Sequence, residues 1–240
     1  MDITKRLLNE SARDYALRQI RNNIISLKLK PGSNVSDNEL AKELGMSRTP
    51  VREALQQLQK INMIEVYPQR GSVISHIDFD IVEETVFLRR VLEKAVVEEL
   101  CDCITDEKLE ELEKNIKLQE FYLDNRSPEK ILELDNEFHK ACFVMCNKER
   151  VYHLMEGMLG HFDRIRALSL YSVKDIKIVA DHKAIINAIR LNDKKLAGEF
   201  VIKHLSRYKL DQSEIMENYP EYFNYEKEKA VASSSVISLL

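Results

Sequence analysis

The sequence predicts a mainly helical protein in two parts, a small N-terminal part with one hairpin and a larger all-helical part. The 240 residues include only six glycines, five prolines and no tryptophan, a composition that favours helices. Apolar residues recur at helical spacing along most of the chain. The exception is residues 64–75, where two short β-prone runs surround a tip rich in turn-forming residues.

Three helices are expected before the hairpin. The first, from about residue 15 to 27, is stopped by Pro31-Gly32. The second can be capped by Ser36 and ends at Gly45, a residue type common just after a helix. The third follows Ser47 and runs to about residue 60, with a proline in its first turn. Two helices joined by a tight turn and followed by a hairpin predict a winged helix-turn-helix.

From residue 80 onward the sequence predicts an antiparallel bundle of about six amphipathic helices with short connections. We therefore expect a winged helix-turn-helix domain at 1–76, an all-helical domain for metal binding, effector binding and dimerisation at 77–219, and a peripheral tail at 220–240. The six helices are expected at about 80–101, 105–123, 127–146, 148–170, 174–190 and 192–217.

Charge and composition limit the partners and the compartment. Residues 1–76 hold twelve Lys and Arg against eight Asp and Glu, whereas residues 77–240 hold 24 against 32. A basic head on an acidic body fits nucleic-acid binding by the head, since Lys and Arg displace counterions from phosphates. Early charged residues argue against a signal peptide, and no run approaches the roughly 20 apolar residues that cross a bilayer. We expect a soluble, cytoplasmic protein without a membrane partner.

Two arginines at the start of the third helix are the candidates for reading DNA. Arg48 and Arg52 lie four residues apart, on the face opposite Val51, Leu55 and Leu58. A recognition helix enters the major groove by its N-terminal end, and arginine can pair with guanine through two hydrogen bonds. The alternative is that both arginines are merely solvated surface residues, or that they pair with Glu53 and Glu39.

The run of residues 39–55, ELAKELGMSRTPVREAL, resembles the GntR family of transcriptional regulators. The resemblance covers about residues 14–76 and implies that the start of the third helix contacts DNA while the hairpin tip enters the minor groove. The position of Asn38 usually holds a basic residue in that family; the asparagine keeps a hydrogen-bond donor but lacks the charge. The implied DNA-binding residues are Asn38, Ser47, Arg48, Thr49, Arg52, Gln69, Arg70 and Gly71.

Four residues of the predicted bundle could bind a metal: Asp135, His139, His182 and His204. Asp135 and His139 are one helical turn apart on an apolar face, and the two other histidines lie on apolar stripes of their own helices. Buried together, these groups would be costly unless a divalent ion satisfied them. Their N and O donors suit Zn²⁺, with Ni²⁺ or Mn²⁺ as alternatives. Each histidine taken alone is also compatible with a hydrogen-bonded core residue, and spacing alone does not bring the four together.

The resemblance to a known family implies that the four residues come together in one site. The four positions are similar to the metal set of the C-terminal effector domain, of the FCD type, in the FadR-like branch of the GntR family, and six helices fit its smaller, VanR-like version. Residues 89–93 also resemble a family signature, Arg-x-x-Leu-Glu, which implies that Arg89 lines the effector pocket and pairs with a carboxylate. A surface pair between Arg89 and Glu93 is the alternative. A metal beside an arginine suits a small organic acid or sugar acid as effector.

These observations predict an effector-controlled transcription factor, a repressor that binds a palindromic double-stranded operator as a homodimer. A metalloenzyme is the alternative from another class, but no general base accompanies the metal candidates and a DNA-binding head argues against turnover. A third hypothesis makes the metal itself the signal, or purely structural. Cys142 and Cys146 continue the stripe of Asp135 and His139; we expect small core residues there, with a soft ligand or redox group as the alternative.

Overall fold

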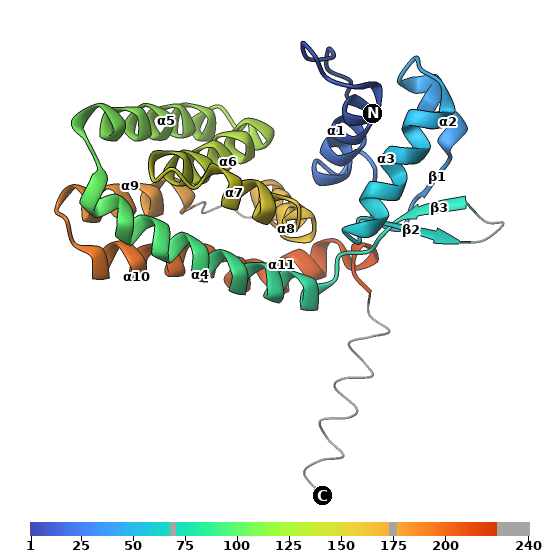
Figure 1. The fold of residues 1–240 in the computed structure, drawn as a ribbon. Coiled ribbons are helices and arrows are strands. Elements are labelled where there is room, and N and C mark those ends of the chain that lie inside the picture. The colour runs from blue at the N-terminus through green and yellow to red at the C-terminus, as the bar shows by residue number, and fades with distance from the viewer. Residues whose placement is uncertain (68–70, 173–176, 225–240) are drawn as a thin grey trace, which may run out of the picture. The chain divides into compact units, whose positions relative to one another are not determined.

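The computed structural model describes residues 1–67, 71–172 and 177–224. Contacts divide the chain into two compact units, one formed by residues 1–79 with the C-terminal segment from 216, the other by residues 80–215. The predicted fold class is confirmed, since helices dominate and one small sheet lies in the first unit (Figure 1). None of the described helices combines the length and apolar character that crossing a bilayer requires.

The first unit begins with three helices and a small antiparallel sheet, in the order of a winged helix-turn-helix (Figure 1). One strand was not expected from the sequence, a two-residue strand between the first two helices. The elements are α1 (Ala12–Ile25), β1 (Asn34–Val35), α2 (Asp37–Glu43), α3 (Arg48–Lys60), β2 (Ile64–Tyr67) and β3 (Gly71–Ile74).

Local interactions position α3. Ser36 caps α2, because its side chain accepts a hydrogen bond from the Asn38 backbone N–H. Gly45 then turns the chain with φ +64°, a left-handed conformation that glycine adopts without a Cβ clash. Ser47 stands at the N-cap of α3, but its side chain makes no capping hydrogen bond. The apolar underside of α3, with Val51 and Leu58 fully buried, fixes which face of the helix meets solvent.

The sheet has the strand order β1-β3-β2, with antiparallel pairing throughout. In the hairpin, Ile64 pairs with Ile74, and Tyr67 pairs with Gly71 at the tip. On the other side of β3, Val35 pairs with Ser72. The hairpin is the expected wing, held in the unit by the buried Ile64 and Ile74.

Residues 220–223 of the expected tail pack against the first unit, in contrast to the expectation of a peripheral segment. A 3₁₀ turn, η1 (Pro220–Tyr222), leads to Phe223, which forms a parallel bridge with Ile77. The Ile77 N–H donates to the Tyr222 carbonyl oxygen at 2.8 Å, and the Phe223 ring stacks on Phe79 at 5.2 Å between centroids. Burial of the Phe223 ring, which is 4% exposed, accounts for the packing. Residues 225–240 of the expected tail lie outside the described residues.

The second unit contains the expected helices, but two of them are interrupted, so eight helices occur within the described residues. The predicted helix over 148–170 breaks near Gly157 and Gly160, both weak helix formers. The last predicted helix breaks at Ser206, whose hydroxyl donates to the Ile202 carbonyl oxygen at 2.7 Å and competes with the helix ladder. The helices are α4 (Phe79–Cys103), α5 (Asp106–Asp124), α6 (Pro128–Met145), α7 (Glu149–Glu156), α8 (Gly160–Ser172), α9 (Ile178–Arg190), α10 (Lys194–Leu205) and α11 (Tyr208–Asn218).

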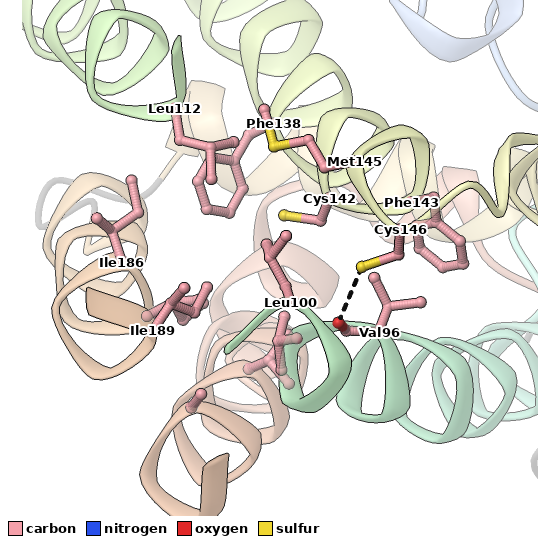
Figure 2. Close-up of a cluster of buried hydrophobic side chains, with 14 of the residues drawn as sticks. Val96, Leu100, Leu112, Phe138, Cys142, Phe143, Met145, Cys146, Ile186 and Ile189 are labelled. Atoms are coloured by element: carbon pink, nitrogen blue, oxygen red, sulfur yellow. Dashed lines mark hydrogen bonds between the residues drawn. The ribbon is translucent and has the colours of Figure 1, made fainter. Parts of the chain in front are cut away.

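The core of the second unit lies between α4, α5, α6, α9 and α10 (Figure 2). Leu100, Leu112 and Ile189 are fully buried and face one another from three of these helices. Cys142 and Cys146 lie in the same core, at 3% and 4% exposure. This apolar packing fixes the helices that carry the polar site described next.

Candidate functional site

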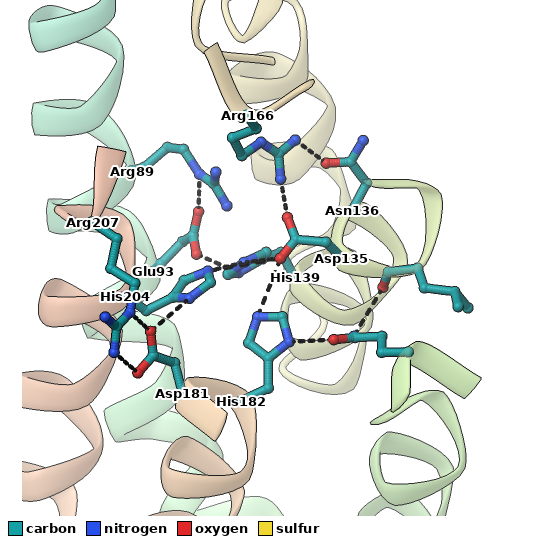
Figure 3. A network of polar contacts seen from close by, with 12 residues as sticks. Arg89, Glu93, Asp135, Asn136, His139, Arg166, Asp181, His182, His204 and Arg207 are labelled. Carbon is teal, nitrogen blue, oxygen red and sulfur yellow. Dashed lines mark hydrogen bonds and ion pairs between the residues drawn. The ribbon is translucent and has the colours of Figure 1, made fainter. Parts of the chain in front are cut away.

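The structure brings the four predicted metal-binding residues together inside the second unit (Figure 3). Asp135 and His139 come from α6, His182 from α9 and His204 from α10. Each offers one candidate ligand atom, and these atoms all lie within 4.8 Å of one another. The His139 and His204 Nε2 atoms are 3.2 Å apart, and the His182 Nε2 atom is 3.3 Å from the Asp135 Oδ1 atom.

Each imidazole directs its Nε2 atom into this cluster and its Nδ1 atom towards an oxygen outside it (Figure 3). Outer hydrogen bonds fix the tautomer and the orientation of metal-binding histidines, although the His204 Nδ1 atom has no hydrogen-bond partner among the described residues. The Nδ1 distances are 2.6 Å from His139 to Glu93 Oε2, 2.8 Å from His182 to Gln119 Oε1 and 3.7 Å from His204 to Asp181 Oδ2.

The centre of the cluster leaves polar atoms unsatisfied. Among the described residues, neither the Asp135 Oδ1 atom nor the His182 Nε2 atom has a hydrogen-bond partner, and both side chains are fully buried. Leaving such atoms unpaired in the interior costs about 1–3 kcal/mol each. A cation bound at this point would satisfy them together. Three imidazole nitrogens and a carboxylate oxygen are a donor set that fits zinc, nickel or manganese.

Neighbouring charges tune the protonation of these groups. Burial opposes ionisation of Asp135, but the Arg166 guanidinium, together with His139 and His182, holds the pKa of that carboxyl well below its usual range. Burial lowers the pKa of both His182 and His204, which keeps these rings neutral. For His139, burial lowers the pKa, but the charge of Glu93 and the contacts with Glu93 and Asp135 together raise it. An ionised carboxylate with neutral imidazoles is the state that binds a metal.

A cavity of about 310 Å³ opens beside the cluster. His204, a candidate metal ligand, belongs to its wall, together with Arg166 and Arg207. Arg166 also contacts Asp135 and Asp163. The cavity therefore has a cationic end next to the cluster. Its apolar lining comes from Leu132, Phe162, Leu170, Ile178, Leu205 and Leu210.

Arg89 lies in the interior, outside the described lining of this cavity. Its Nε atom donates to Glu93 Oε1 at 2.5 Å, and the two side chains are 2% and 3% exposed. The pair considered from the sequence is thus formed, but it is buried rather than on the surface. The Arg89 Nη1 atom has no hydrogen-bond partner within the described residues. The guanidinium lies 5.1 Å from the ring centroid of Phe162, and that of Arg166 lies 5.4 Å from the same ring.

In the first unit, the predicted residues of α3 are exposed. Arg48 is 57% exposed and pairs with Asp37 at 3.0 Å, which holds its side chain across the turn between α2 and α3. Gly71 opens β3 with φ +92°. Gln69 and Arg70 lie outside the described residues. The other predicted DNA-binding residues that the structure describes are also on the surface: Asn38, Ser47, Thr49 and Arg52.

Comparisons with known proteins match this arrangement. Residues 13–74 match the bacterial regulatory proteins of the gntR family, and residues 84–207 match the FCD domain. An uncharacterised HTH-type transcriptional regulator from an unstable DNA locus of Streptomyces ambofaciens is 32% identical over 220 residues, which cover 88% of this chain and 89% of the relative. The chain belongs to the GntR family. It is a transcriptional regulator with an FCD domain.

A second relative is also a transcriptional regulator, and a solved structure shares the fold. The HTH-type transcriptional repressor RspR of Escherichia coli is 26% identical, with 87% of this chain and 92% of RspR covered. The solved structure of E. coli McbR/YncC has the same fold, with a TM-score of 0.74 at 19% identity and coverage of 87% and 99%. Because these relatives are transcriptional regulators, the metalloenzyme hypothesis is not supported.

Several polar residues around the cluster of this GntR-family protein were not found as site residues from the sequence. Asp181 directly precedes His182, and Arg207 follows His204 by three residues, so the ligand positions themselves are a signal for both. Glu93 was found only as a partner of Arg89. Gln119 carries no local signal, because only packing of α5 against α9 brings it to His182.

Proposed function

We propose that this regulator is a metal-containing repressor whose DNA binding is controlled by a small carboxylate. In this proposal a homodimer binds a palindromic operator through α3 and the wing, and binding of the acid beside the metal releases the DNA. The observation that carries the proposal is the buried cluster of one carboxylate and three imidazoles, which adjoins a cavity with arginines in its wall.

Zinc is the first candidate for the metal, with nickel or manganese as alternatives. The residues that would hold it are Asp135, His139, His182 and His204. Four protein ligands complete a tetrahedral zinc site, whereas nickel and manganese take more ligands and would leave positions for an effector oxygen. The metal identity therefore bears on whether the ion is structural or takes part in effector binding.

A small organic acid or sugar acid fits the polar end of the cavity. The cationic groups there are Arg166 and Arg207, and both pair with carboxylates that an effector would compete with. Arg89 lies outside the described cavity lining but supports the same class, because its Nη1 atom and the Arg166 Nε atom are both buried with no hydrogen-bond partner among the described residues. A carboxylate can accept two hydrogen bonds from one guanidinium. The apolar wall would contact the rest of the effector.

Metal binding is tested first, by calorimetry with Zn²⁺, Ni²⁺ and Mn²⁺ on metal-free protein. We expect one tight site per chain in the wild type and its loss in His182→Ala. The matched control is His153→Ala, because the side chain of His153 is 50% exposed and lies outside the cluster. Equal affinity in both variants would refute the proposed ligand set.

Regulation is tested next, with an operator selected from a pool of random duplexes. Binding is titrated with metal, in the presence and absence of a panel of small acids. Release by an acid only when metal is bound supports the proposal. Release or binding driven by metal alone would instead make the metal the signal, and no response to any acid would exclude this effector class.

Repression is favoured because RspR, which covers most of this chain, is a transcriptional repressor. Transcription in vitro from a promoter that carries the selected operator tests the sign. We expect transcript to fall with added protein and to return with the effector. A rise in transcript with protein would make the chain an activator.

A further inference from the structure

Two thiols of the FCD unit lie close together, and neither belongs to the polar site described above. Cys103 is the last residue of α4, and Cys146 is the C-cap of α6. Their Sγ atoms lie 3.9 Å apart, although 43 positions separate them in the chain. Both cysteines are free. The sulfur atoms are therefore already in contact across two helix ends.

The two sulfurs differ in access. Cys103 is exposed, whereas Cys146 is 4% exposed and its Sγ atom lies 3.6 Å from the Val96 carbonyl oxygen (Figure 2). Burial raises the pKa of the Cys146 thiol to about 12. Because Cys103 is exposed and Cys146 is buried, an oxidant from solvent would react first with Cys103, whose Sγ atom lies next to that of Cys146. An exposed thiol backed by a second thiol is the arrangement of many redox-sensing cysteines.

We propose that Cys103 and Cys146 form a reversible disulfide that ties the end of α4 to the end of α6. The Sγ atoms must approach from 3.9 Å to roughly 2.0 Å. Side-chain rotation and a small shift of the last residue of α4 supply this movement, since helix ends fray readily.

A peroxide is the oxidant. The Cys103 sulfur attacks one peroxide oxygen, the O–O bond breaks, and a sulfenic acid and one water form. The Cys146 sulfur then attacks the Cys103 sulfur, and its proton leaves with the hydroxyl group as a second water. The two thiols are oxidised by two electrons, and the peroxide is reduced by two. A thiol reductant reverses the bond by exchange.

The bridge would join two helices that support the proposed metal site. α4 carries Glu93, whose carboxylate contacts His139, and α6 carries His139 and Asp135. The crosslink would also close the loop of residues between the two cysteines, which restricts the unfolded chain. We expect the oxidised FCD unit to melt at a higher temperature than the reduced one.

The test uses the full-length protein, treated with one equivalent of hydrogen peroxide and then with an alkylating reagent. Mass spectrometry of the unreduced digest should show the Cys103 peptide joined to the Cys146 peptide, lighter by two hydrogen atoms than the two free peptides. A thiol reductant should return both peptides and lower the melting temperature to its starting value.

Cys103→Ser is the main variant, because Cys103 is exposed and its substitution should not disturb folding. Cys101→Ser is the matched control on the same helix. Cys103→Ser should abolish the linked peptide and the rise in melting temperature, and Cys101→Ser should keep both. A different cysteine pair, oxidation of Cys103 to sulfinic acid without a bridge, or a bridge that leaves the melting temperature unchanged would overturn the proposal.

Discussion

Glu93 connects a sequence signature to the proposed metal ligands. One of its oxygens accepts from Arg89, and the other lies 2.6 Å from the His139 Nδ1 atom. Burial would raise the pKa of Glu93, but Arg89 and His139 outweigh it and lower this pKa to about 2. The carboxylate is therefore charged near neutral pH, and it contacts the His139 Nδ1 atom while Nε2 is directed into the cluster.

This contact predicts how metal affinity depends on pH. Burial alone would lower the pKa of His139, but the Glu93 charge raises it, so His139 takes up a proton before the other two rings as the pH falls. Zinc affinity should therefore decrease, by up to about tenfold per pH unit below the pKa of His139. Glu93→Gln removes the charge and should move this decrease to lower pH. It should also weaken zinc binding by about tenfold near pH 8, because an outer partner is altered.

Calorimetry with Zn²⁺ across this pH range checks the prediction. Glu98→Gln is the matched control, because Glu98 also lies on α4 but pairs with the exposed Lys94. If Glu93→Gln and the wild type had the same pH profile, the assigned role of Glu93 would be wrong.

The residues of the site differ in how far the sequence predicted them. The four proposed ligands were identified because all four lie on apolar helix faces and match a family pattern. Their outer partners were missed because each depends on a neighbouring helix, as Gln119 on α5 depends on α9. A short-range pattern locates donors on one helix face, but only packing between helices shows which oxygen each imidazole meets.

On α3, the proposed reading of DNA rests on the contrast between a buried and an exposed face. Arg52→Ala should weaken binding to the selected operator by about 10–100-fold, since one paired arginine–guanine contact is worth about 1–3 kcal/mol. Fluorescence anisotropy with the operator and a scrambled duplex measures this change. Lys195→Ala, at a residue 88% exposed on α10, removes the same charge elsewhere and should leave the affinity unchanged. Equal losses on operator and scrambled DNA would assign Arg52 to phosphate contacts instead.

Two glycines at helix ends should respond in opposite ways to alanine. Gly45 has φ +64°. Gly45→Ala should therefore destabilise the protein by about 1–2 kcal/mol, although the added methyl group would meet no atom within 4 Å. Gly157 has φ −59°, and an added Cβ would lie 3.6 Å from the Leu154 carbonyl oxygen, an ordinary contact. Gly157→Ala should therefore be neutral or stabilise by up to about 1 kcal/mol. Urea unfolding followed by circular dichroism compares them, and a larger loss for Gly157→Ala would contradict the argument.

These glycines also show what limited the prediction of elements. Gly45 was interpreted correctly as a helix end, because the apolar pattern stops there too. Gly157 and Gly160 interrupt a run whose apolar pattern continues through Met155, Leu159 and Phe162. Periodicity alone therefore extended one helix across 148–170, although the glycines allow the break between α7 and α8.

The chain connects the two units twice. It leaves the first unit at α4 and returns after α11, where Phe223 bonds and stacks against the segment of Ile77 and Phe79. Tyr208, Leu210 and Asp211 of α11 also line the cavity beside the cluster of Asp135 and the three histidines. In the sequence, α11 thus directly precedes the C-terminal residues that belong to the first unit.

This connection through α11 predicts a variant that still binds the effector but no longer releases the operator in response. Phe223→Ala removes the stacked ring, so movement of α11 should no longer reach the Ile77 segment. We expect effector affinity by calorimetry to stay within about twofold, while the effector-induced loss of operator affinity becomes smaller. Tyr219→Ala, whose ring stacks on Tyr222, is the control within the same segment. An unchanged effector response in Phe223→Ala would exclude this route.

An apolar strip on α4 favours self-association of the whole molecule. Phe87 and Val91 are 71% and 54% exposed and lie one turn apart on the same helix face. Large apolar side chains side by side on a surface commonly mark an interface. In a two-fold symmetric dimer each residue of this strip would enter the interface twice, which fits the homodimer expected on a palindromic operator.

Phe87→Glu should therefore dissociate the proposed dimer. Because the dimer is symmetric, one substitution per chain would place two carboxylates in the interface, where they would be buried or would repel each other. We expect the dimer dissociation constant to rise at least about tenfold, as one tenfold step corresponds to only about 1.4 kcal/mol. Sedimentation velocity over a range of concentrations measures it, with circular dichroism to verify folding. Leu191→Glu is the matched control, since Leu191 is 74% exposed at the end of α9. Dissociation by Leu191→Glu but not by Phe87→Glu would place the interface elsewhere. Whichever variant is monomeric should also lose binding to the palindromic operator.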